Sequence, residues 1–188
     1  ILISELNDFN GYIDLSDTNV KNLAGIEHTG STAVNLSNTR VTDLTPLAGM
    51  QRLRTLTMTD MEDEIDVSPL AECSNLAYLD LSRSQVLNLS ALSGTHLTEL
   101  TLKDCEINSL SELSELPAIE TLDLSGNQIS DISILSSFTT LKHLNLSGNP
   151  LSSADAVSTL TSLQSLDLSA TNIQDISPLQ DLTSLNSL

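Results

Sequence analysis

The stretch Ile119-Glu-Thr-Leu-Asp-Leu-Ser-Gly-Asn-Gln-Ile129 carries the pattern from which the fold is predicted. Its first, fourth, sixth and eleventh positions are apolar, and a polar residue separates the two leucines at its centre. Similar segments begin at residues 10, 31, 53, 76, 97, 119, 141 and 163, and a partial one begins at 185. These eight segments, numbered here as repeats 1 to 8, follow one another every 21 to 23 residues and indicate a repeat architecture.

The fourth and sixth positions are apolar in every one of the eight repeats. They read Ile13/Leu15, Val34/Leu36, Leu56/Met58, Leu79/Leu81, Leu100/Leu102, Leu122/Leu124, Leu144/Leu146 and Leu166/Leu168. Apolar residues two apart with a polar residue between them predict a strand with one buried face. Because the strand recurs in every repeat, we expect the strands to stack in parallel.

The second half of each repeat has a different period. Apolar residues fall at steps of three, as in Ile129, Ile132, Leu135 and Phe138, which favours short 3₁₀ turns over a full α-helix. Position 15 is typical of a helix N-cap, and a proline suited to the first turn follows it in three repeats. The position-15 residues are Thr45, Ser68, Ser90, Ser111, Ser133, Asp155 and Ser177, and the prolines are Pro46, Pro69 and Pro178.

The motif Leu-x-x-Leu-x-Leu-x-x-Asn-x-Ile resembles that of leucine-rich repeat proteins, and the turn from Asp175 to Leu179 is similar to that of the bacterial internalin class. The resemblance covers residues 10–188. It implies an α/β fold, a right-handed solenoid with a parallel β-sheet on its concave face and 3₁₀ turns on its convex face. It also implies recognition of a protein ligand, at the cell surface or in secreted form.

Position 9, where the family prefers asparagine, varies along the chain. It reads Thr18, Thr39, Met61, Ser84, Cys105, Asn127, Asn149 and Thr171, so that only Met61 lacks a hydrogen-bond donor. The repeat of Met61 also has an extra residue and an acidic run from Asp60 to Asp66. We therefore expect the loop after its strand to bulge. This loop is either a harmless length variant or a weak calcium site.

Charge and motifs exclude several functions. Seven basic against 25 acidic residues give a net charge of −18, which opposes binding to nucleic acid. No apolar run approaches the roughly 20 residues that span a bilayer, so we expect no membrane insertion. His28, His96 and His143 occupy different parts of the repeat, and the chain contains no nucleophile or zinc-protease motif. We predict no enzyme, no metal and no cofactor, and we interpret Cys73 and Cys105 as buried thiols.

Positions 3, 5 and 7 alternate with the buried positions and should line the concave face. Residues that depart from the recurring Asp-Leu-Ser filler are the preferred binding candidates, because aromatic and basic anchors dominate interfaces. A patch on repeats 4 and 5 is the first candidate, although Arg83 could equally form a cross-strand ion pair with Asp60 or Asp104. The full set of binding candidates is Tyr78, Arg83, Glu99, Lys103, Tyr12, Asp80, Asp123 and His143.

We therefore expect one leucine-rich repeat domain over residues 1–188, monomeric, that binds a protein ligand without catalysis. No signal peptide is recognisable at the first residues, so the expected surface location depends on the resemblance alone. Two other functions remain open. One is an intracellular regulatory scaffold, similar to the leucine-rich subunit of a protein phosphatase, and the other is a rigid spacer within a larger protein. The apolar Leu185 and Leu188 should be covered by a further repeat or a cap.

Overall fold

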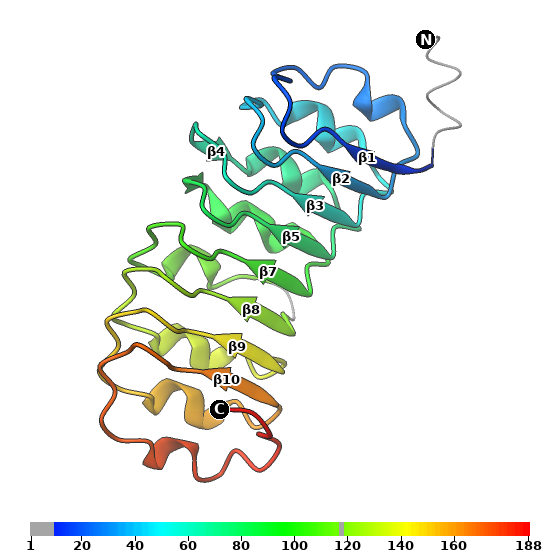
Figure 1. The fold of residues 1–188 in the computed structure, drawn as a ribbon. Helices are drawn as coiled ribbons and strands as arrows, with labels where there is room; N and C mark the ends of the chain where they lie inside the picture. Colours follow the sequence, from blue (N-terminus) through cyan, green and yellow to red (C-terminus); the bar gives the residue numbers. More distant parts are fainter. Residues whose placement is uncertain (1–9, 117–118) are drawn as a thin grey trace.

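A ladder of short parallel strands forms one face of the protein. The computed structural model describes residues 10–116 and 119–188, so the first nine residues of the expected domain, where no signal peptide is recognisable, lie outside the described part. Eight strands follow the order β1-β2-β3-β5-β7-β8-β9-β10, as Figure 1 shows. The strands are β1 (Tyr12–Asp14), β2 (Ala33–Asn35), β3 (Thr55–Thr57), β5 (Tyr78–Asp80), β7 (Glu99–Thr101), β8 (Thr121–Asp123), β9 (His143–Asn145) and β10 (Ser165–Asp167).

The strand register reproduces the repeat alignment. Ile13 lies opposite Val34, Leu56 opposite Leu79, and Leu144 opposite Leu166, so that position 4 always faces position 4. A further bridge joins Ser165 to Ser187 in the partial repeat. The predicted parallel stack is therefore confirmed, and each position of the repeat forms a column that runs along the sheet.

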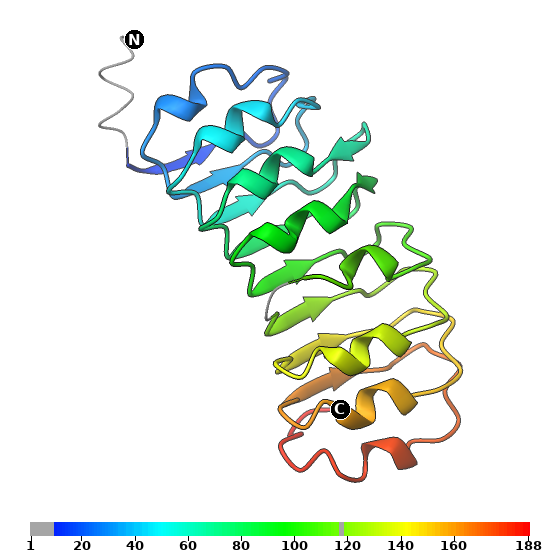
Figure 2. The same cartoon turned by 180° about the vertical axis from the view of Figure 1, so that it is seen from behind.

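Short 3₁₀ helices form the opposite face, which Figure 2 shows from behind the sheet. Six of the seven predicted starting residues are confirmed, and η4 begins at Leu89, one residue before the predicted Ser90. The helices are η1 (Ile26–His28), η2 (Thr45–Gly49), η3 (Ser68–Glu72), η4 (Leu89–Gly94), η5 (Ser111–Leu113), η6 (Ser133–Ser137), η7 (Asp155–Thr159) and η8 (Ser177–Leu179).

The predicted capping role of position 15 is wrong. In η2 the N-cap is Leu44, and its side chain makes no capping hydrogen bond. The side chain that hydrogen-bonds to the first turn of the helix lies at position 13 instead, where Asp43 accepts a hydrogen bond of 2.9 Å from the backbone N–H of Thr45. Asp175 accepts the same bond from Ser177 at 2.8 Å. The turn is thus closed by an aspartate two residues earlier, which is the usual Asx turn.

The hydrophobic core fills the space between the two faces. Leu56 and Met58 of one repeat, like Leu100 and Leu102 of another, have no exposed surface. Both cysteines are free and buried, as predicted. Burial raises the pKa of the Cys73 thiol to about 11, with the Glu72 charge adding to the shift, so this thiol stays protonated at neutral pH.

Position 9 stabilises the bend after each strand. The Asn127 amide donates to the carbonyls of Leu102 and Leu124, both at 2.8 Å, while its Oδ1 accepts from the N–H of Cys105 and of Ile107, both at 3.0 Å. Asn149 repeats this pattern one repeat later. These amides satisfy backbone groups that would otherwise be buried without partners.

The loop of the Met61 repeat bulges as expected. Ten residues separate Thr55 from Ile65, whereas eight separate Tyr78 from Val86 in the next repeat. Compared with the next repeat, this loop is therefore two residues longer. The repeat as a whole, with 23 residues, exceeds the usual 22 by only one. It leads into β4 (Ile65–Asp66), which pairs in parallel with β6 (Val86–Leu87) as a second, two-stranded sheet. The sequence pattern did not predict this second sheet.

Asn127→Ala is predicted to lower the free energy of unfolding by about 3 kcal/mol, because it leaves several buried backbone groups without partners. Asn172, which is exposed, provides the control: Asn172→Ala should change the free energy by less than about 0.5 kcal/mol. Urea unfolding followed by circular dichroism measures both. Equal stability of the two variants would contradict the bonding role of Asn127.

Ser31→Ala is predicted to stabilise the protein by about 1 kcal/mol. Ser31 is fully buried, and its hydroxyl oxygen has no hydrogen-bond partner. Ser84→Ala should have the opposite sign, because the Ser84 hydroxyl donates to the Met58 carbonyl at 3.1 Å and accepts from the Met61 N–H at 3.2 Å. A loss of thermal stability in Ser31→Ala would refute this account of the Ser31 site.

Candidate functional site

The concave face is built from columns 3, 5 and 7 of the repeat, which correspond to the two ends of each strand and the residue two beyond it. The column-5 side chain closes the turn at the end of its own strand by bonding to the residue two positions later. Asp80 Oδ1 accepts from the Ser82 N–H at 2.9 Å and from the Ser82 hydroxyl at 2.6 Å. Asp123 Oδ1 accepts from the Ser125 N–H at 2.8 Å. The Asp-Leu-Ser filler therefore has a structural use in every repeat that carries it.

Column 7 is less accessible than predicted. Ser82 is 5% exposed and Ser125 is 6% exposed, because each lies against the turn that its aspartate closes. The expectation that this whole column lies open to a partner is wrong at these two positions. Lys103, which replaces serine in this column, is exposed.

Column 8 adopts a left-handed backbone in all eight repeats, a feature that sequence reasoning missed. Asparagine, aspartate and glycine tolerate this conformation best, and their enrichment at position 8 was the available signal. Arg83, with φ of 57°, and Ala170, with φ of 54°, are exceptions to that enrichment. The column reads Asp17, Asn38, Asp60, Arg83, Asp104, Gly126, Gly148 and Ala170.

Arg83 forms the ion pair that one of the two interpretations predicted. Its Nε lies 2.5 Å from Asp60 Oδ1 and its second guanidinium nitrogen 2.6 Å from Asp60 Oδ2, a bidentate pair. The hydrogen bond from Arg83 lowers the pKa of Asp60 below its ordinary value. Because the two side chains are 50% and 44% exposed, the pair contributes at most about 1 kcal/mol.

Repeats 4 and 5 bring part of the predicted patch together. Tyr78 lies opposite Glu99 in the register of β5 and β7, and the Arg83 N–H donates to the Lys103 carbonyl at 2.8 Å. Burial raises the pKa of the half-buried Tyr78, and the charges of Asp80 and Glu99 add to the shift. The Arg83 guanidinium, however, turns toward Asp60 on the preceding repeat and away from Lys103.

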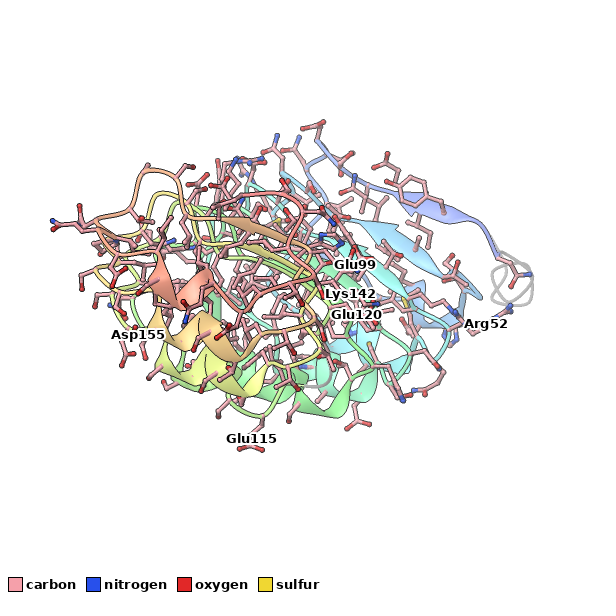
Figure 3. All side chains as sticks on the ribbon, turned by 90° about the horizontal axis from the view of Figure 1, so that it is seen from below. Arg52, Glu99, Glu115, Glu120, Lys142 and Asp155 are labelled. Carbon is pink, nitrogen blue, oxygen red and sulfur yellow. The ribbon has the colours of Figure 1, made fainter. Side chains whose placement is uncertain are left out.

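Asp80 lies on the same strand as Tyr78, and Asp123 lies on β8 next to β7, but Tyr12 and His143 do not join this patch. Tyr12, 58% exposed, lies on β1, and the exposed His143 lies on β9, six strand spacings or roughly 29 Å away. In Figure 3, the labelled Glu99 lies apart from Glu115 and Asp155, which project from the convex layer. The predicted residues thus define a long face with candidate contacts spread along it.

A polar groove occupies the N-terminal half of the concave face. It has a volume of about 750 Å³, and it contains hydroxyls, amides, three carboxylates and one guanidinium. All of its lining residues come from columns 5, 7 and 8 of repeats 1 to 4: Ser16, Asp17, Asn35, Ser37, Asn38, Thr57, Thr59, Asp60, Asp80 and Arg83. The sequence reasoning singled out Asp80 and Arg83 but not the groove that connects them.

The described residues offer no site for metal chemistry. Within residues 10–116 and 119–188, no group of three histidine, cysteine, aspartate or glutamate side chains could hold a metal ion, and the acidic loop after β3 is included in that search. No helix in the same part of the chain is long and apolar enough to cross a membrane.

Comparison with known proteins identifies the repeats. A family model described as leucine-rich repeats (2 copies) matches residues 95–137 and 139–181. Comparison with curated proteins gives no significant match. Leucine-rich repeat proteins are protein-interaction modules and generally lack enzymatic activity.

Solved structures share the fold. Internalin C2 of Listeria monocytogenes is 32% identical, with a TM-score of 0.75 over 88% of this chain and 74% of that one. Internalin F of the same organism is 24% identical, with a TM-score of 0.73, and this chain spans 62% of its length. A leucine-rich repeat protein of Leptospira interrogans is 20% identical, with a TM-score of 0.88 over 99% of this chain and 50% of that one.

These matches agree with the parallel ladder, the 3₁₀ helices and the 22-residue motif described above. The chain belongs to the internalin-like family of leucine-rich repeat proteins.

Proposed function

We propose that this chain is a non-catalytic binding module whose concave face contacts a protein ligand at a bacterial surface or in secreted form. The observation that carries the proposal is the position of the side chains that depart from the Asp-Leu-Ser filler. Tyr78 and Glu99 lie in register on the neighbouring strands β5 and β7, and Lys103 follows β7 by two residues. Apart from Tyr12 and His143, the other repeats carry small residues at these two positions. Glu99 and Lys103 are exposed, so the packing of the solenoid does not require their side chains.

Their chemistry suits a protein interface. A tyrosine offers a large rigid surface with a hydroxyl at its end, and it is enriched among the residues that dominate binding energy. Glu99 and Lys103 lie beside it with opposite charges, which favours a ligand surface of mixed charge. Membership in the internalin-like family supports the surface or secreted location.

The spacer alternative also has support in the structure. The Asp and Ser rows of the remaining repeats use their polar atoms to close their own strand exits, as Asp167 does with Ser169 at 2.8 Å. A chain that serves only as a spacer needs only these hydrogen bonds within each repeat, and no free polar groups for a ligand. The two functions differ in one respect, because a spacer loses nothing when the side chains on repeats 4 and 5 are truncated.

Tyr78→Ala is predicted to weaken capture of a protein ligand by about tenfold, the effect of losing an interface anchor. Arg83→Ala is predicted to weaken it by at most about fivefold, because the exposed ion pair with Asp60 contributes at most about 1 kcal/mol. The immobilised wild-type chain is first used to retain proteins from bacterial and host-cell surface extracts, and the retained proteins are then titrated against each variant. Arg40→Ala is the matched control, because Arg40 is exposed and only approaches Glu62 at 3.9 Å.

Circular dichroism and urea unfolding establish that each variant remains folded. Undiminished capture by both variants would exclude repeats 4 and 5 as the contact region. Equal loss in Arg40→Ala would show that net charge, and not this patch, governs capture.

A further inference from the structure

The groove on repeats 1 to 4 has a chemistry of its own, distinct from that of the patch around Tyr78. We propose that this groove is the docking site of an extended basic segment of the protein ligand, an inference that rests on the proposed function and specifies the partner. The segment crosses strands β1, β2, β3 and β5 and presents lysine or arginine side chains to the carboxylates at either end.

Three carboxylates in or beside the groove keep an oxygen available: Asp17 and Asp80 line it, and Asp14 lies next to it, in register with the lining residue Asn35. Asp14 and Asp80 each use Oδ1 for the backbone and hydroxyl of the serine two residues later. Asp17 uses Oδ1 to accept from the Asn38 amide at 2.8 Å. In each of these three residues, Oδ2 has no partner within the described part of the chain. Carboxylate oxygens are acceptors only, so their natural partners are ammonium and guanidinium groups.

Arg83, the one cation among the lining residues, directs its guanidinium hydrogen bonds to Asp60, although its charge also acts on Asp80. Arg83 is held by both oxygens of Asp60, so the two charges of that pair largely cancel. The remaining charges are the carboxylates of Asp17 and Asp80 in the groove and of Asp14 beside it. The local field is therefore negative, in agreement with the net charge of −18 for the whole chain.

Two tyrosines lie on the same face of the sheet as the groove, each two residues before a column-5 aspartate. Column 3 reads Tyr12, Ala33, Thr55 and Tyr78 in direct register across β1, β2, β3 and β5. The small residues between the two rings leave room for an incoming chain. A lysine or arginine can lay its aliphatic stem and its cation on an aromatic ring while its charge reaches a carboxylate.

The dimensions set the spacing of the ligand's charges. Asp14 and Asp80 stand in the same column, three strand spacings or about 14 Å apart. An extended chain covers about 3.3 Å per residue, so two basic residues four positions apart reach both ends of the groove.

The test uses the peptide Gly-Lys-Ser-Thr-Ser-Lys-Gly with a fluorescent label, titrated with the full chain and followed by fluorescence anisotropy. Asp14→Asn combined with Asp80→Asn is expected to weaken binding about fivefold, the effect of losing two exposed ion pairs. Asparagine preserves the strand exit, because Asn35 and Asn145 accept the same backbone hydrogen bond at 3.0 Å in their own repeats.

The control is Asp123→Asn combined with Asp167→Asn, which makes the same change of charge in the same column outside the groove. Binding by this variant should fall less than about twofold, and a peptide with glutamine in place of both lysines should not bind. Equal weakening in the two double variants, or no binding of the lysine peptide to the wild type, would overturn the groove assignment. Capture that still depends on Tyr78, which does not line the groove, would then leave the proposed function standing. Loss of the dependence on Tyr78, with the groove results as expected, would leave the groove assignment alone.

Discussion

The stacking of inward-facing leucine side chains at the spacing of parallel strands is the interaction on which the rest of this structure depends. Position 4 faces position 4 from β1 to β10, and the buried side chains form one continuous core from repeat to repeat. Each repeat buries its apolar face only against its neighbours, so stability accumulates along the stack. The strands are three residues long, and hydrogen bonding within such short strands could not hold the ladder together alone.

Polar side chains bond the backbone groups at both ends of the leucine-bearing strands. Asn127 and Asn149 bond the carbonyls and amides at the bend after the strand, and the position-5 carboxylates close the strand exit on the other side. These bonds use up much of the polar capacity of the concave face. The atoms left for a partner are therefore few, and they lie where a repeat departs from the pattern, as with Lys103, or where a carboxylate has a second oxygen, as with Asp80. The two proposals concern these two kinds of position.

The sequence predicted the repeat boundaries, the buried positions and the 3₁₀ helices, because all three follow from the spacing of apolar residues. Other features depend on backbone dihedral angles and on local bonding, which spacing does not record. The left-handed position 8, the Asx turns at position 13 and the pairing of β4 with β6 belong to this group. Arg83 illustrates the limit for the site: its two possible partners were both identified, but only the structure shows that the guanidinium turns to Asp60 and so shapes the groove instead of the patch.

Thiol accessibility along two strands, β7 and β9, tests most directly whether leucines face inward and polar residues face outward. Cysteine introduced by Glu99→Cys or His143→Cys should react rapidly with a thiol reagent in the folded chain, while cysteine introduced by Leu100→Cys or Leu144→Cys should react only after unfolding, as should the native buried Cys73 and Cys105. Protection at 99 and 143 together with rapid reaction at 100 and 144 would contradict the fold and both proposals built on it.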